Sequence, residues 1–144
     1  MISFILMMVA GALNAVMDKI AFNFKTSVFK NLNPLFWDVR QSWKNQWKQP
    51  LQPCTKYWWY FGLYRPKYQE NFPYSTTMLV MFTDAWHLAK TLMLLCIGFA
   101  IGLHVPVVNW FVDGLIMVVV FTTVFTYFYD YILNSKKQNG FLGR

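Results

Sequence analysis

Residues 91–126 read TLMLLCIGFAIGLHVPVVNWFVDGLIMVVVFTTVFT, and Asp113 carries the only charged side chain in this stretch. Two long apolar runs flank Pro106, which favours a turn where one helix ends and another begins. Each run approaches the roughly 20 residues that a helix needs to cross the hydrocarbon of a bilayer. The stretch therefore predicts two membrane-spanning helices joined by a short connection.

The composition of the whole chain indicates a membrane protein, because 56% of its residues are hydrophobic, 20% are aromatic and only 13% are charged. In lipid, the backbone of a spanning segment must satisfy its own hydrogen bonds, so the spans should be helices. A third apolar stretch opens the chain. We therefore predict an all-α integral membrane protein with three transmembrane helices, at residues 1–24, 76–104 and 107–133, plus an interfacial amphipathic helix in the first loop.

Basic side chains are concentrated in the loop at residues 25–75 and in the tail at residues 134–144, whereas the connection at Pro106 has none. Because basic loops stay in the cytoplasm, we expect the N terminus outside and the C terminus in the cytoplasm. The net charge of +7 makes anionic lipid headgroups the expected partner, worth about 1 kcal/mol per juxtamembrane base. No nucleic-acid-binding motif accompanies this charge, so nucleic acid is not an expected partner.

The loop between the first two spans is crowded with aromatic residues. Asn33 and Pro34 are typical of a helix start, with asparagine as the N-cap, and they predict an amphipathic helix over about residues 34–48. The side chains expected at the lipid interface are Phe36, Val39, Arg40, Trp43, Lys44, Trp47, Trp58 and Trp59. They either anchor the loop to the bilayer or form an aromatic groove for a lipid, a peptide or a partner helix.

Four aspartates, Asp113 among them, lie inside or at the edges of apolar segments, where a charge without compensation is strongly unfavourable. Asp18, Asp84 and Asp130 fall at a similar depth when they are counted from the cytoplasmic ends of the predicted helices. His87 and Lys90 lie one or two helical turns deeper. These five titratable groups could therefore meet in one layer of the bundle.

Three interpretations of this cluster are open. In the first, Lys90 or Lys19 neutralises an aspartate and the cluster sets the register of the helices. In the second, the cluster is a metal site of a hydrolase or transferase, with Asp18, Asp84, His87 and Asp130 as metal ligands and Asp84, His87 and Lys90 as catalytic groups. In the third, the carboxylates line a proton or cation path in an oligomer.

A divalent metal is the only cofactor that the sequence indicates, because no nucleotide or haem signature is present. Cys54 and Cys96 lie in different segments and form no CxxC pair. Asp113 stands apart from the cluster, and we expect it to cap the third helix or to pair with His104.

Small residues predict where helices come close together. Gly98 and Gly102 form a GxxxG motif in the second span, and Gly11 and Ala15 share a face of the first. Such faces allow another helix to approach closely, from this chain or from a neighbour. The N-cap candidates for the second span are Ser75, Thr76 and Thr77.

Four strings occur together in this chain: SVFKNLNPLFW at residues 27–37, SWKN at 42–45, STT at 75–77 and TDAWH at 83–87. In combination they resemble a family of small, uncharacterised membrane proteins from the Bacteroidota and their phages, over roughly residues 16–90. The resemblance implies a bacterial or phage source and an inner-membrane location, and it brings no known activity. Members of that family often carry histidine where this chain has Asn23, and asparagine is a poorer ligand for zinc-like ions.

These patterns favour a small, non-enzymatic membrane protein that acts as an accessory or interaction subunit of a larger or oligomeric assembly. The alternative is a membrane-embedded, metal-dependent hydrolase or transferase that uses the Asp/His cluster. A proton- or cation-conducting oligomer is the third hypothesis. The expected partners are the lipid bilayer and either another membrane protein or further copies of this chain.

Overall fold

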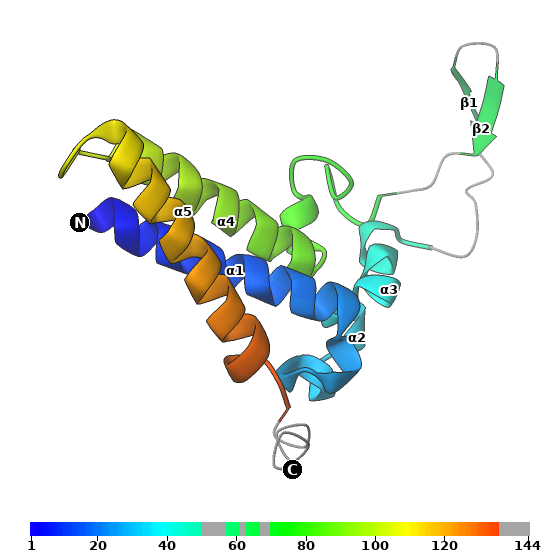
Figure 1. Ribbon diagram of the computed structural model, residues 1–144. Helices are drawn as coiled ribbons and strands as arrows, with labels where there is room; N and C mark the ends of the chain where they lie inside the picture. Colours follow the sequence, from blue (N-terminus) through cyan, green and yellow to red (C-terminus); the bar gives the residue numbers. More distant parts are fainter. Residues whose placement is uncertain (50–56, 61–62, 67–69, 136–144) are drawn as a thin grey trace.

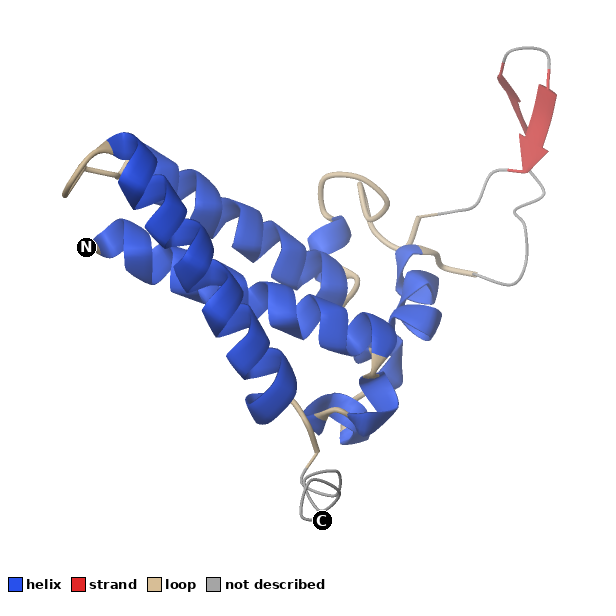
Figure 2. Ribbon diagram, viewed as in Figure 1, coloured by secondary structure: helices blue, strands red, loops and turns tan. Residues whose placement is uncertain are grey.

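Three long helices dominate the computed structural model, which describes residues 1–49, 57–60, 63–66 and 70–135 (Figures 1 and 2). They are α1 (Ile2–Phe22), α4 (Ala85–Gly102) and α5 (Trp110–Tyr127), and α5 continues into a π-helical turn at Phe128–Ile132. All three are long and apolar enough to cross a membrane. The predicted helical fold with three candidate membrane spans is therefore confirmed.

Helix α1 is the centre of the bundle, because it packs along both α4 and α5, whereas those two helices diverge from their connecting turn (Figure 1). Small side chains make these contacts close. Ala10 and Ala15 of α1 and Ala100 of α4 are fully buried. A Cβ atom on Gly11 would stand 2.5 Å from the carbonyl oxygen of Phe121 in α5. Glycine is therefore required where α1 and α5 cross.

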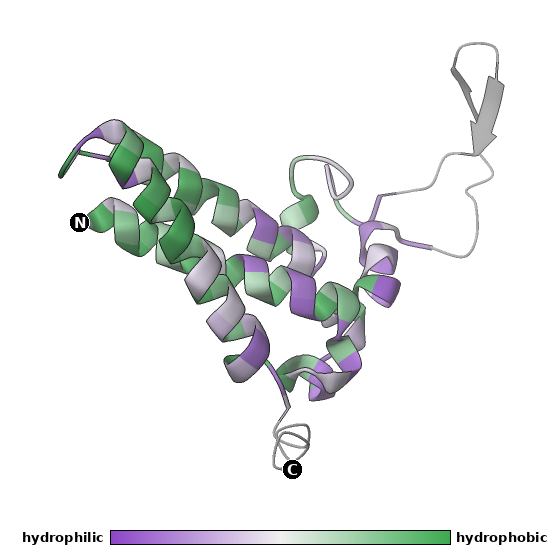
Figure 3. Cartoon of the chain, in the orientation of Figure 1, coloured by the Kyte–Doolittle hydropathy of each residue, from purple (hydrophilic) through white to green (hydrophobic). Residues whose placement is uncertain are grey.

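The outer faces of the bundle are apolar. Phe99 of α4 and Phe111 and Val118 of α5 are exposed, and apolar residues cover most of the length of the three helices (Figure 3). Polar residues gather at the end of the bundle where α1 finishes and α4 begins (Figure 3). Continuous exposed apolar surface of this kind suits helices that are surrounded by lipid.

The second long helix begins at Ala85, nine residues after the predicted start at residue 76. Asp84 is its N-cap, in an extended conformation with φ −157° and ψ 159°. The expected caps have other partners, because Ser75 donates a hydrogen bond to the Gln46 carbonyl at 2.8 Å and Thr76 donates one to the Glu70 carboxylate. Residues 77–83 form turns, including a 3-10 turn at Val80–Phe82.

The predicted amphipathic helix over residues 34–48 is broken into three short pieces. They are α2 (Pro34–Trp37), α3 (Val39–Ser42) and a 3-10 turn (Trp43–Gln46). Asn33 caps α2 as expected, accepting a hydrogen bond from the Leu35 amide at 3.0 Å. Asp38 then adopts an extended conformation and caps α3, accepting from the Arg40 amide at 3.0 Å. Because Asp38 caps a new helix in the middle of this segment, the segment is not one continuous helix. The regular helical spacing expected of Phe36, Val39, Trp43 and Trp47 is therefore interrupted.

A short antiparallel hairpin, β1 (Tyr57–Tyr60) and β2 (Leu63–Pro66), lies beyond the helical part of the loop. It was not predicted, because the run of aromatic residues there was interpreted as membrane-surface contact. The side chains of Trp58 and Trp59 lie outside the part of the chain that the structure describes, as do Cys54 and most of the tail at residues 134–144.

Candidate functional site

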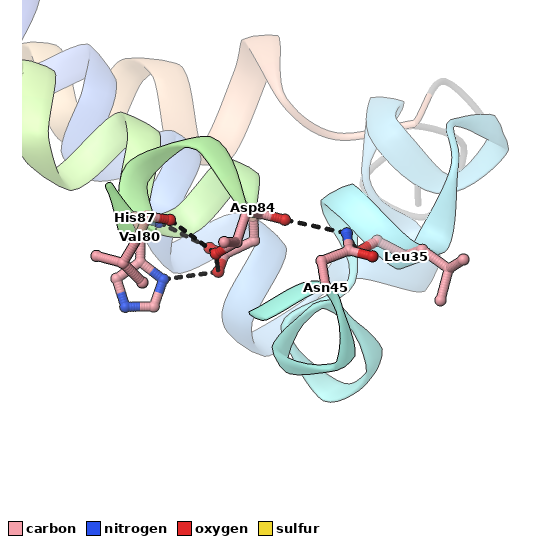
Figure 4. Close-up of polar contacts among 6 residues, drawn as sticks. Leu35, Asn45, Val80, Asp84 and His87 are labelled. Atoms are coloured by element: carbon pink, nitrogen blue, oxygen red, sulfur yellow. Dashed lines mark hydrogen bonds and ion pairs between the residues drawn. The ribbon is translucent and has the colours of Figure 1, made fainter. Parts of the chain in front are cut away.

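An aspartate–histidine pair stands at the start of α4. Asp84 is 2% exposed. Its Oδ1 accepts a hydrogen bond from the His87 amide at 2.8 Å, and its Oδ2 lies 2.7 Å from His87 Nδ1. Thr83 Oγ1 donates a further hydrogen bond to Oδ2 at 3.1 Å. The same carboxylate therefore caps the helix and orients the imidazole ring (Figure 4).

The surrounding loops hold this pair in place. Asn45 donates from Nδ2 to the Leu35 carbonyl at 2.6 Å and to the Thr83 carbonyl at 3.0 Å, so it ties α2 to the residue before the cap (Figure 4). The single hydroxyl proton of Thr83 is shared between Asp84 Oδ2 and the Val80 carbonyl oxygen, which lies 2.7 Å from Oγ1. These contacts explain why α4 begins directly after its cap, Asp84. The backbone before Asp84 is held by hydrogen bonds within the loop.

His87 reaches the surface. Its side chain is 32% exposed and its ring meets the Trp86 ring edge-on, with 5.0 Å between the ring centroids. Nε2 of His87 has no hydrogen-bond partner among the described residues. An imidazole held at Nδ1 by a carboxylate and free at Nε2 can accept or donate a proton there.

Lys90 does not join this pair. Its ammonium group lies over the Trp86 ring, 4.7 Å from the ring centroid. A cation–π contact of this kind holds the long side chain along the helix surface. Of the three predicted catalytic groups, Asp84 and His87 are therefore in contact, and Lys90 contacts the neighbouring tryptophan.

The predicted metal site is not formed. Within the described residues, no three His, Cys, Asp or Glu side chains lie close enough together to hold a metal ion. Asp18 is half-buried on α1, and Asp130 is exposed in the π-helical turn that follows α5. The expectation failed because depth along three separate helices says nothing about the direction in which each side chain points.

Sequence reasoning missed a buried cation where α1 meets the end of α5. Lys19 is 3% exposed, and its Nζ donates to the Tyr129 carbonyl at 3.1 Å and to Asn134 Oδ1 at 2.5 Å. The ammonium group also lies 4.3 Å from the centroid of the Tyr129 ring. Asn23 donates from Nδ2 to the Tyr129 hydroxyl at 2.6 Å. A lysine near the end of an apolar helix was the available signal.

At the opposite end of the bundle, a second aspartate organises the connection between α4 and α5. Asp113 is fully buried; its Oδ2 accepts from the Val107 amide at 2.7 Å and lies 3.1 Å from His104 Nε2. Asn109 caps α5, accepting from the Val112 amide at 2.9 Å. Of the two roles expected for Asp113, pairing with His104 is therefore the correct one.

The two glycines of the GxxxG motif lie on the outer face of α4. A Cβ atom added to Gly98 or to Gly102 would meet nothing within 4 Å. Ala100, between them in sequence, is fully buried. Unlike Gly11, these glycines take no part in packing within the part of the chain that the structure describes.

Comparison of this chain with known protein families, with curated proteins and with solved structures finds no match. The resemblance to small membrane proteins of the Bacteroidota and their phages therefore stays a prediction.

Proposed function

We propose that this protein is a small integral membrane protein that functions by binding another membrane-spanning helix, as an accessory subunit of a larger or oligomeric assembly. The observation that carries this proposal is the open position of Gly98 and Gly102. Glycine lowers helix propensity by up to about 1 kcal/mol relative to alanine. Two glycines one turn apart, on a face that no other part of the described chain covers, are explained by a helix that approaches from outside.

The experiment is to replace each of these glycines with leucine and to measure association in membranes. Gly98→Leu and Gly102→Leu should abolish crosslinking or co-purification with the partner, or energy transfer between two labelled copies of the chain. Gly114→Leu is the matched control, because a Cβ there also meets nothing within 4 Å but the residue lies on α5. An equal effect of all three variants, or a wild-type protein that crosslinks to nothing, would contradict the proposal.

The loop between α1 and α4 is proposed as the membrane-surface anchor. Trp43 is 42% exposed, and the rings of Phe29 and Trp37 stack at a centroid distance of 4.8 Å. Indole rings favour the headgroup region. Alanine at Trp43 and Trp47 should release the loop from the bilayer, measured as increased protease cleavage; an unchanged membrane footprint with lost partner binding would favour the aromatic groove instead.

The proposed location is a bacterial inner membrane, with the N terminus outside. The basic residues at the end of α1 and in the following loop support this orientation, because they belong on the cytoplasmic side. A C-terminal alkaline phosphatase fusion should be inactive, since that enzyme folds only outside the cytoplasm. An active fusion would reverse the topology.

A hydrolase or transferase is the second candidate function, and the Asp84–His87 pair favours it. The pair offers an oriented imidazole for proton transfer at the end of a spanning helix, without the predicted metal ligands Asp18 and Asp130. The test is mass spectrometry of phospholipid vesicles incubated with the protein. A product formed by the wild type but not by His87→Gln would favour the enzymatic function over the accessory role. The conducting oligomer stays a prediction.

A further inference from the structure

A cavity of about 110 Å³ lies where α1 ends and the surface loop begins. Its polar lining comes from Asn23, Lys25, Thr26, Asp38 and Arg40, and the apolar part comes from the last turn of α1 and from Phe24. Phe22, the last residue of α1, is 72% exposed. The cavity therefore lies at the boundary between the hydrocarbon and the headgroup region, whichever way the protein is oriented in the membrane.

Most of the polar groups around the cavity already have partners within the chain. Asn23 binds the Tyr129 hydroxyl, and Thr26 Oγ1 donates to the Asn23 carbonyl at 3.2 Å. The two oxygens of Asp38 accept from the Arg40 amide and from Gln41 Nε2, at 3.0 and 3.4 Å. The Asp38 carboxylate thus caps the start of α3, and its negative charge offsets part of the positive charge of the two cations that line the same cavity.

The two cations are different. Neither the Lys25 ammonium nor the Arg40 guanidinium has a hydrogen-bond or ion-pair partner among the described residues. Lys30 offers a contrast, since its Nζ donates to Ser135 Oγ at 2.7 Å. Two unpaired cations beside one polar cavity at the membrane boundary present donors that a phosphate group can accept from.

We infer that this cavity binds a phosphate group, held between Lys25 and Arg40, and that a phospholipid headgroup is the source of this phosphate. The apolar lining by the end of α1 suits the part of a lipid next to its phosphate. The inference does not depend on the partner helix proposed above, because it concerns a different part of the molecule. The inference predicts a specific lipid site. The charge of the loop by itself predicts only a general attraction to anionic membranes.

The experiment compares two double variants of the full-length protein in nanodiscs of phosphatidylcholine with a minor fraction of phosphatidylglycerol. Lys25→Gln with Arg40→Gln removes the two charges at the cavity. Lys44→Gln with Lys48→Gln is the matched control, since it removes the same charge from the same loop but neither residue lines the cavity. Bound phosphatidylglycerol is measured by native mass spectrometry.

The cavity variant should bind phosphatidylglycerol at least about tenfold more weakly than the control variant, since the loss of one charge-assisted hydrogen bond alone is expected to have that effect. Arg40→Lys, which keeps the charge and loses the planar donor pair, should show an intermediate loss. Equal weakening of both double variants, or of neither, would overturn the site.

A second arm separates the two sources of phosphate. Inorganic phosphate is titrated against the protein in dodecyl maltoside micelles, which contain no phosphate, and followed by phosphorus NMR. Saturable binding in the wild type that is lost in the cavity variant, without any preference for phosphatidylglycerol, would support the phosphate site with a soluble ligand. Absence of both kinds of binding from the wild type would overturn it.

Discussion

Gly11 of α1 and Phe121 of α5 are in contact through their backbones, so closely that a Cβ on Gly11 would stand 2.5 Å from the Phe121 carbonyl oxygen. The opposing atoms belong to a helix backbone and cannot move aside as a side chain can. The crossing of α1 and α5 therefore depends on glycine.

Gly11→Ala should lower the free energy of unfolding by about 1–3 kcal/mol, the usual cost of overpacking a close contact. Thermal unfolding in detergent, followed by circular dichroism, measures this change. Gly114→Ala is the control, because its new methyl group would meet open space and should be neutral or slightly stabilising. Equal melting temperatures for the two variants would contradict the close crossing.

Asp84→Ala should lower stability by about 0.5–2 kcal/mol, because the N-cap of α4 is lost. Asp84→Ser separates the two roles of this residue: serine restores the cap but cannot hold His87 Nδ1. We expect Asp84→Ser to recover most of the stability while the imidazole of His87 becomes mobile, which NMR relaxation of that ring detects. A fully stable Asp84→Ala variant would show that the cap contributes little.

Lys19→Met should lower stability by about 1–3 kcal/mol, because it leaves the buried Tyr129 carbonyl and Asn134 amide oxygen without their donor. The effect should be greatest where the end of the π-helical turn meets the loop. Hydrogen exchange of the Val28 and Ser135 amides, which donate to Leu133 and Thr26, reports on this contact. Unchanged protection of both amides would mean that Lys19 does not hold the two segments together.

Asp113→Asn should lower the melting temperature, because the carboxylate accepts from the Val107 and Val108 amides and pairs with His104. His104→Gln alone should have a smaller effect, since the amide contacts of Asp113 remain. A double-mutant cycle measures the coupling between the two side chains. Strictly additive effects would show that the pair is not a stabilising contact.

Local signals in the sequence predicted several elements correctly. The length and apolarity of each span were sufficient to identify α1, α4 and α5, and Asn33 with Pro34 marked the start of α2. The start of α4 was predicted nine residues too early, at the caps Ser75, Thr76 and Thr77, although aspartate is an equally good cap and Asp84 is the one used. The choice depends on Gln46, which takes the Ser75 hydroxyl, and on Asn45, which holds the Thr83 carbonyl.

The candidate site, too, was predicted correctly only where it depends on residues close together in sequence. The sequence paired Asp84 with His87 because a separation of three residues places two side chains on neighbouring positions of a helix start. It could not tell that Asp18 and Asp130 form no metal-binding group with that pair, nor that Lys19 reaches the carbonyl of Tyr129, 110 residues away. Contacts between distant segments depend on how each helix is rotated about its own axis, and hydropathy does not encode that rotation.

Helices that are long and apolar enough to cross a membrane can be identified from the sequence alone, because the bilayer imposes one local requirement on each of them, a continuous apolar length with internally satisfied hydrogen bonds. The tertiary structure was needed to show which polar groups compensate one another. The buried charge of Lys19 is compensated by a carbonyl, an amide and an aromatic ring. Among the glycines, Gly11 makes a close contact between helices, whereas Gly98 and Gly102 lie on an open face. These outcomes depend on packing between segments far apart in sequence, where many combinations of partners satisfy the same local pattern.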